Sequence, residues 1–99
     1  MRRSRMLSGA MTEQNHPNPF NPRTTIRFVL ASGGHVTLSI YETEGRLVRT
    51  IVDGERASGP HEAQWDGRDG AGNPVGSSVY FYRLTAGKFS SARKMVLLK

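Results

Sequence analysis

Cysteine is absent from all 99 residues of the sequence. Without cysteine the chain can form no disulfide, and it can build no zinc or iron–sulfur site that uses thiolate ligands. Long apolar runs are absent too: a run such as residues 95–98 is far shorter than the about 20 apolar residues that a membrane-spanning helix needs. We therefore expect no membrane span and a fold that depends on noncovalent packing.

Helical patterning is also missing. No stretch repeats apolar residues at the 3.6-residue spacing of a helix between capping signals, so essentially no helix is expected. With 36% hydrophobic and 22% charged residues, the composition is nevertheless that of a folded globular protein. A chain of 99 residues allows one small domain of modest stability.

Groups that could form a catalytic site are scarce. His16, His35 and His61 stand in separate segments, and nothing beside them in the sequence suggests a nucleophile or a metal partner. Catalysis needs converging groups with matched pKa values. The sequence therefore predicts a protein that is not an enzyme and that uses no cofactor.

Positive charge is in excess, because fourteen Lys and Arg stand against eight Asp and Glu, for a formal net charge of +6. Such an excess raises the question of nucleic acid binding. Three arginines stand at positions 2, 3 and 5, and most of the others are spread through the chain among acidic neighbours without forming a basic stripe. We therefore expect no nucleic acid partner.

The first 14 residues are polar with a basic start. Their apolar stretch, residues 6–11, is too short and too polar for the core of a secretory signal peptide. We expect a disordered leader over residues 1–14 and a single folded domain over residues 15–99.

Alternation of apolar and polar residues predicts strands. Residues 24–30 place Ile26, Phe28 and Leu30 at period two, as in a half-buried strand, and residues 36–41 repeat the pattern. Further strands are expected over residues 47–52, 61–65, 79–86 and 89–98, and the aromatic-rich residues 79–86 are expected to be covered on both faces. Short strands joined by Gly-rich turns are typical of an all-β sandwich or small barrel.

The core is expected to form around Trp65, the largest apolar side chain, between the sheets. Phe20 is expected to anchor the proline-rich residues 15–22 against that core, with a solvated linker as the alternative for this segment. The candidate core residues are Phe20, Ile26, Phe28, Leu38, Ile40, Trp65, Tyr80, Tyr82 and Leu84.

The longest internal loop, residues 66–74, carries the only set of side chains with metal-ligand character. Asp66, Asp69 and Asn73 could offer oxygen ligands to calcium. Two carboxylates make a thin site, and Asp and Asn commonly bond to their own backbone in turns. We expect no metal here, with calcium as the weaker alternative.

Tyrosines raise a second alternative. Tyr41, Tyr80 and Tyr82 with Phe81 could form a stacking platform for a ligand if several lay on one exposed face. Alternation places Tyr80 and Tyr82 on the face opposite Phe81, which favours core packing for both tyrosines.

Several motifs follow one another in a fixed order. They are NPFNP (18–22), TTI (24–26), VTLSIY (36–41), GRLV (45–48), WDGRD (65–69), GNPV (72–75), VYFYRL (79–84) and KMVLL (94–98). In order and spacing they closely resemble the Ig-like domain found in the flagellar hook-capping protein and in C-terminal sorting domains of the type IX secretion system. The resemblance covers about residues 15–99.

The resemblance implies an immunoglobulin-like antiparallel β-sandwich of about seven strands that acts as a sorting signal or structural domain at the C-terminal end of a larger secreted or surface protein. Its partner would be secretion machinery or another protein, and the module itself is expected to be monomeric. The last strand would be recognised, because an edge strand offers unpaired backbone groups. The candidate recognised residues are Lys94, Met95, Val96, Leu97, Leu98 and Lys99. A carbohydrate- or protein-binding module is the alternative function.

Overall fold

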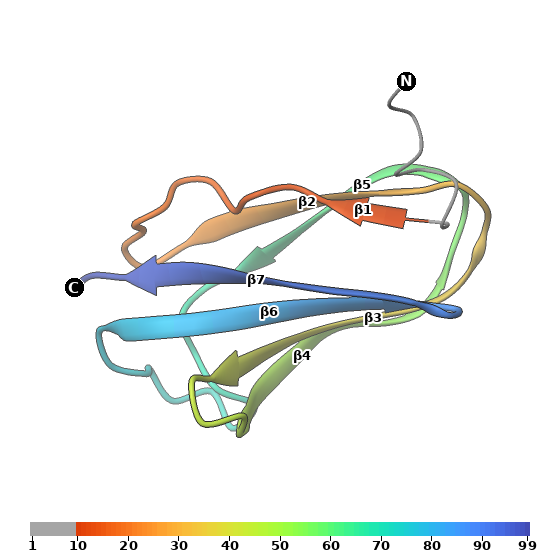
Figure 1. Ribbon diagram of the computed structural model, residues 1–99. Coiled ribbons are helices and arrows are strands. Elements are labelled where there is room, and N and C mark those ends of the chain that lie inside the picture. The colour runs from red at the N-terminus through yellow and green to blue at the C-terminus, as the bar shows by residue number, and fades with distance from the viewer. Residues whose placement is uncertain (1–9) are drawn as a thin grey trace.

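The computed structural model describes residues 10–99, in which the chain forms seven β-strands and no helix (Figure 1). Within these residues no helix is long and apolar enough to cross a membrane. The strands are β1 (Ala10–Thr12), β2 (Thr24–Leu30), β3 (Gly34–Glu42), β4 (Leu47–Arg56), β5 (Gly59–Trp65), β6 (Ser78–Ala86) and β7 (Phe89–Leu97).

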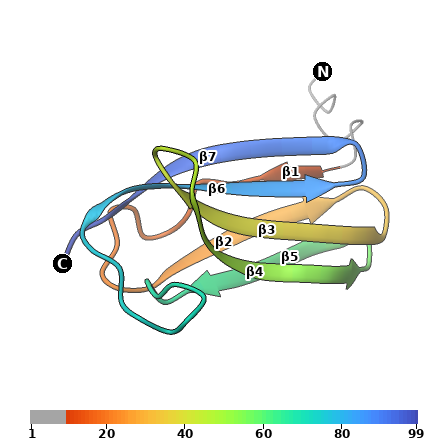
Figure 2. The ribbon, with the colours of Figure 1, turned by 90° about the horizontal axis from the view of Figure 1, so that it is seen from below.

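The strands form two sheets that face each other (Figures 1 and 2). A three-stranded sheet has the order β1-β2-β5, and a four-stranded sheet has the order β4-β3-β6-β7. Every paired strand runs antiparallel to its neighbour. The predicted all-β, antiparallel sandwich of about seven strands is therefore confirmed.

The core lies between the sheets because β2, β3 and β6 turn alternate apolar side chains inward. In β2, Ile26, Phe28 and Leu30 are at most 2% exposed. Trp65, at the end of β5, is fully buried against Phe20, with ring centroids 5.7 Å apart. All nine candidate core residues are 5% exposed or less: Phe20, Ile26, Phe28, Leu38, Ile40, Trp65, Tyr80, Tyr82 and Leu84.

Two strands differ from their predicted form. Strand β4 continues to Arg56, although Asp53 and Gly54 suggested a break, because the antiparallel pairing with β3 continues to its end, where Val36 pairs with Gly54. Strand β6 is not covered on both faces: its inner tyrosines are buried, whereas Phe81 is half-buried and Arg83 is exposed on the outer face. The aromatic residues of β6 therefore lie on both faces of the sheet, the tyrosines in the core and Phe81 on the outer face.

The expected disordered leader needs a correction at its end. Residues 10–12 form β1, where Ala10 pairs with Leu30 and Thr12 with Phe28. Ala10 is fully buried and Thr12 is 5% exposed, so this short strand closes the open edge of β2. The first nine residues of the expected leader lie outside the residues that the structure describes.

Candidate interaction site at the last strand

Strand β7 forms one edge of the four-stranded sheet. Its register with β6 is regular from Phe89 to Leu97, so successive side chains alternate between the core and the outer face. Met95 and Leu97 are fully buried, whereas Lys94, Leu98 and Lys99 are exposed. The six residues expected to be recognised therefore divide between the core and the surface.

The backbone of the end of β7 is not open, contrary to what an edge strand suggested. The proline segment, residues 15–22, lies beside it and forms a short parallel bridge between Phe20 and Leu97. The Phe20 N–H donates to the Val96 carbonyl at 3.0 Å, and the Leu98 N–H donates to the Phe20 carbonyl at 3.0 Å. The Asn18 Oδ1 atom accepts from the Val96 N–H at 2.9 Å. A partner therefore cannot add a strand here without displacing the proline segment.

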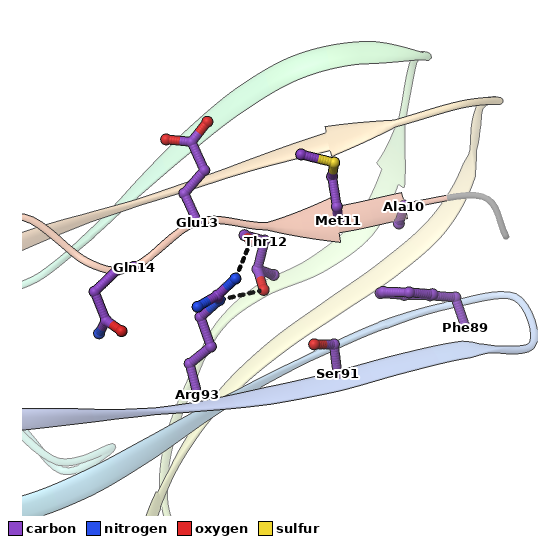
Figure 3. A pocket seen from close by; sticks show the side chains of 8 residues that line it. All are labelled: Ala10, Met11, Thr12, Glu13, Gln14, Phe89, Ser91 and Arg93. Carbon is purple, nitrogen blue, oxygen red and sulfur yellow. Dashed lines mark hydrogen bonds between the residues drawn. The ribbon is translucent and has the colours of Figure 1, made fainter. Parts of the chain in front are cut away.

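Side chains link the middle of β7 to the neighbouring sheet. Gln14 Nε2 donates to the Lys94 carbonyl at 2.8 Å. Arg93 makes two hydrogen bonds to Thr12 of β1 (Figure 3). Its Nε donates to the Thr12 hydroxyl at 3.2 Å, and a terminal nitrogen donates to the Thr12 carbonyl at 3.1 Å. These bonds hold the edges of the two sheets together along the side of the sandwich.

The first half of β7 is more open. A groove of about 480 Å³ lies between it and β1 (Figure 3). In an antiparallel pair, the backbone N–H and C=O groups of every second residue point away from the partner strand. Those of Val96 point away from β6, so those of Ala92 and Ser90, an even number of residues upstream, do so as well. Among residues 10–99, none hydrogen-bonds to these backbone groups of Ala92 and Ser90. The groove is lined by Ala10, Met11, Thr12, Glu13, Gln14, Phe89, Ser91 and Arg93.

Unpaired positive charge gathers on the β6–β7 hairpin and the residues around it. No Asp or Glu follows Asp69 in the sequence, whereas five Lys and Arg do. None of the five forms an ion pair with any residue between 10 and 99, while Arg27, Arg46 and Arg49 elsewhere do. The expectation that the arginines of the body stand among acidic neighbours was therefore wrong for Arg83 and Arg93. The five are Arg83, Lys88, Arg93, Lys94 and Lys99.

The loop of residues 66–74 uses its acidic side chains to shape turns. Asp69 Oδ1 accepts from the N–H groups of Ala71 and Asn73 at 3.0 and 2.9 Å. Asp66 Oδ1 accepts from Arg49 and from the Arg68 N–H, both at 3.2 Å. Across residues 10–99 no three His, Cys, Asp or Glu side chains gather as a metal site would require. These contacts match the turn role, and calcium stays an untested alternative.

Gly67 joins this loop to the proline segment. Its φ is +77°, which favours glycine, and a Cβ there would lie 3.2 Å from the Pro22 carbonyl oxygen and 3.9 Å from Leu97 Cδ2. The glycine therefore permits the close approach that lets the proline segment reach β7.

The three histidines lie apart in the structure. The backbone of His16 pairs with Thr25. His35 Nε2 lies 2.7 Å from Asp53 at the surface. His61 stacks on Phe28, with ring centroids 5.3 Å apart. No shared site brings them together.

Two buried tyrosines of β6 donate hydrogen bonds from their hydroxyls to backbone carbonyls elsewhere in the fold. The Tyr80 hydroxyl donates to the Gly76 carbonyl at 2.7 Å, four residues upstream, in the manner of a tyrosine corner. The Tyr82 hydroxyl donates to the Glu13 carbonyl at 2.6 Å and so ties β6 to the residue after β1. Burial raises the pKa of both hydroxyls. Tyr41 is the tyrosine left on the outer face, beside Phe81.

Sequence reasoning missed the side chains that fasten β7, namely Gln14, Asn18 and Arg93. Their bonds join residues about eighty positions apart in the chain, and no local pattern marks them. The charge of the hairpin could have been found, because the absence of Asp and Glu after Asp69 is visible in the sequence.

Comparison with known protein families finds a match that covers most of the strands. The sequence model of the FlgD Ig-like domain matches residues 21–89, which is more than half of the chain. The chain belongs to the FlgD Ig-like domain family. FlgD is described as a basal-body rod modification protein in Salmonella typhimurium, and that relative is 39% identical over 51 residues. The match covers 52% of this chain and 22% of FlgD, so the chain corresponds to about a fifth of the relative.

Two solved structures from Porphyromonas gingivalis share the fold. Dimeric latent PorU superposes with a TM-score of 0.71 at 24% identity, over 90% of this chain and 9% of PorU. PorZ is described as an essential surface component of the type IX secretion system; it superposes with a TM-score of 0.61 at 27% identity, over 95% of this chain and 12% of PorZ. This FlgD Ig-like chain is thus similar to small parts of much longer proteins.

Proposed function

We propose that this FlgD Ig-like domain is a non-catalytic module that serves as a C-terminal sorting or structural domain of a secreted or surface protein. Its partner is secretion machinery or another protein, and the module acts as a monomer. The observation that carries the proposal is the end of β7, where Lys94, Leu98 and Lys99 are exposed beside a backbone that the proline segment already occupies.

This arrangement changes which groups a partner would contact. Because the backbone of Val96 and Leu98 is bonded to Phe20 and Asn18, side chains must carry recognition at the end of the strand. Met95 and Leu97 are fully buried and act by holding the strand in place. Backbone pairing is available only further upstream, at Ser90 and Ala92, where an added strand could lie along the groove.

One comparison supports a role in export or at the surface. PorZ, at 27% identity, is a surface component of the type IX secretion system, and this chain corresponds to 12% of its length. The family also includes the domain of FlgD. A module that recurs in longer proteins fits a role in sorting or assembly.

A fusion experiment tests the sorting role. Residues 10–99 are attached to the C-terminal end of a periplasmic reporter in a host that has type IX secretion, and reporter at the cell surface is measured. We expect surface export of the fusion and its loss in the double variant Leu98→Ser, Lys99→Glu, because these substitutions change the exposed end of β7 without entering the core.

The matched control is Leu47→Ser with Arg56→Glu. Leu47 and Leu98 are both 54% exposed, and each double variant changes the charge equally. Thermal melting of each purified fusion shows whether the domain is folded. A folded wild-type domain that leaves the reporter in the periplasm contradicts the sorting role, and equal loss in both double variants contradicts recognition at the end of β7.

A further inference from the structure

The outer face of the four-stranded sheet carries an apolar row at one end. Tyr41 on β3 stands opposite Leu47 on β4 and opposite Phe81 on β6. Directly opposed residues of antiparallel strands project to the same face, so Tyr41 and Phe81 lie side by side on the outer face. The register of β3 with β4 shifts between Ile40 and Tyr41, and Leu47 extends the row beyond this shift. Leu47 is 54% exposed, and Tyr41 and Phe81 are half-buried. A row of apolar side chains is therefore exposed to solvent on this face.

The row borders a hollow of about 420 Å³. Ala92 of β7 lies opposite Arg83 of β6, and its small side chain leaves room beside Phe81. The turn after β3 forms the other wall. The hollow is lined by Tyr41, Glu42, Thr43, Gly45, Phe81, Arg83 and Ala92.

Charged groups of both signs border this hollow, and its open cation lies on the β6 side. Glu42, the acidic residue of its lining, is bound to Arg46, which donates to the two carboxylate oxygens at 3.2 and 3.0 Å. Arg83 instead bonds to the Ser90 hydroxyl at 3.0 Å and forms no ion pair with residues 10–99. Lys94 stands opposite Phe81 and continues the row on β7. The lining therefore has one carboxylate bound to Arg46 and one cation, Arg83, without a carboxylate partner among residues 10–99. Glu44, in the turn between the lining residues Thr43 and Gly45, accepts from the Thr43 hydroxyl at 3.2 Å.

We propose that this surface docks a segment of another polypeptide in which an acidic side chain stands beside an aromatic or aliphatic one. The apolar side chain would cover Tyr41 and Phe81, and the carboxylate would reach Arg83, whose planar guanidinium suits paired hydrogen bonds to a carboxylate. The Tyr41 hydroxyl, which bonds to no other residue in the range 10–99, supplies a further polar contact.

A polypeptide fits the surface better than an anionic glycan. Sugar rings stack on aromatic faces, but the most exposed member of the row is the aliphatic Leu47, at 54%. Three apolar side chains on adjacent strands complement apolar side chains of a partner, and apolar and aromatic anchors with Arg at their border are typical of protein interfaces. The proposal is independent of the sorting role, since it does not use Leu98 or Lys99.

Selection from a random library of dodecapeptides on phage, with the full chain immobilised, tests the proposal. We expect recovered peptides to combine Asp or Glu with a neighbouring Phe, Tyr, Leu or Trp. A synthetic peptide of the recovered sequence is then titrated by fluorescence anisotropy against the variants. Phe81→Ser and Arg83→Gln should each weaken binding by at least about fivefold, the threshold of a significant interface contact.

The matched control is Arg56→Gln, which removes the same charge at the opposite end of the β3–β4 pair, where Arg56 pairs with Gly34. We expect a change below about twofold, because an exposed charge at that distance is largely screened at physiological salt. Equal weakening by Arg83→Gln and Arg56→Gln contradicts a defined site and indicates general charge attraction.

Two further outcomes overturn the proposal. One is recovery of peptides without acidic residues. The other is that heparin, a sulfated polysaccharide, binds in a way that depends on Phe81 and Arg83, while the binding of no recovered peptide depends on them. That result would assign the surface to a glycan. Amide shifts in two-dimensional NMR spectra show that each variant is folded and whether the peptide perturbs β3, β6 and β7. Export of the reporter fusion is unaffected by these outcomes, so the two proposals fail separately.

Discussion

Trp65 connects three parts of the fold through one side chain. It is fully buried and lies against Phe20 and Tyr80, with ring centroids 5.7 and 5.4 Å away. Its indole N–H donates to the Arg68 carbonyl at 2.9 Å and so also orders the loop that follows β5. A small domain has few residues of this size to bury, so Trp65 carries a large share of the core.

Replacing Trp65 tests this share. Trp65→Ala is expected to lower the free energy of unfolding by about 3–5 kcal/mol, because it removes buried apolar area and leaves a cavity. Trp65→Phe should cost less, since the ring contacts survive in part. Denaturant unfolding followed by circular dichroism measures both. Leu47→Ala, at a residue that is 54% exposed, is the control, and a Trp65→Ala cost as small as that of the control contradicts the assignment.

Tyr82 gives a prediction on pH. Burial raises the pKa of its hydroxyl, while a backbone hydrogen bond at Asn15 and the charge of Arg93 act in the opposite direction. An unfolded tyrosine ionises near pH 10, so above that pH the folded state retains protons that the unfolded state has lost. The contribution of the Tyr82 hydroxyl to stability is therefore present in full below about pH 10, and it is lost as the pH rises through the raised pKa of the folded state.

The variant Tyr82→Phe separates the two effects of this hydroxyl. At pH 7 it should lose about 0.5–1.5 kcal/mol, the usual worth of one hydrogen bond, here the bond to the Glu13 carbonyl. Its melting temperature should then fall less steeply than that of the wild type between about pH 10 and 12. Tyr41→Phe is the control at pH 7. An alkaline fall as steep in Tyr82→Phe as in the wild type contradicts the prediction.

At the scale of elements, the proline segment decides how β7 is presented. It crosses from the three-stranded sheet, where His16 pairs with Thr25, to the four-stranded sheet, where Phe20 pairs with Leu97. Asn15, 2% exposed, holds the start of this crossing by donating to the Thr24 hydroxyl at 2.9 Å and to the Pro17 carbonyl at 3.1 Å. The segment therefore acts as a cover for the edge of β7 and not as a solvated linker.

Hydrogen exchange tests this cover. In Asn18→Ala the Val96 N–H loses the acceptor Oδ1 at 2.9 Å and should exchange faster by about tenfold, the factor that corresponds to 1.4 kcal/mol. The amide of Tyr82, inside the β6–β7 ladder, should keep its protection. Loss of protection at both amides would indicate general destabilisation instead of local opening. Unchanged exchange at Val96 contradicts the cover.

At the scale of the whole molecule, the uneven distribution of charge has a measurable consequence. The four ion pairs among residues 10–99 involve surface groups and contribute little to stability. The five Lys and Arg after Asp69 have no such partners, and they repel one another across the β6–β7 hairpin and its surroundings. Salt screens this repulsion.

Raising sodium chloride from about 10 mM to about 500 mM is therefore expected to raise the melting temperature by a few degrees, because the Debye length falls from roughly 30 Å to a few ångströms. Lys88→Glu, in the turn between β6 and β7, should reduce the effect. Differential scanning calorimetry measures both proteins. A melting temperature that falls with salt would mean that ion pairs outweigh the repulsion.

Much of the architecture could be read from the sequence because strand patterns are local. The alternation over residues 24–30 coincides with β2, and the inner faces of β3 and β6 also followed from period two. Strand β1 was missed because three residues are too short to show alternation. The extension of β4 to Arg56 was missed because it depends on pairing with β3, which the residues of β4 do not encode by themselves.

By itself, the sequence determined the fold class, the main strands and the placement of most large apolar side chains, because alternation and turn residues act over a few positions. Only the tertiary structure decided which parts of β7 are open. The bonds from Gln14, Asn18 and Phe20 to β7 join residues far apart in the chain. The row of Leu47, Tyr41 and Phe81 likewise exists only through the register of three strands. Such contacts depend on the packing of the two sheets, and no local pattern records them.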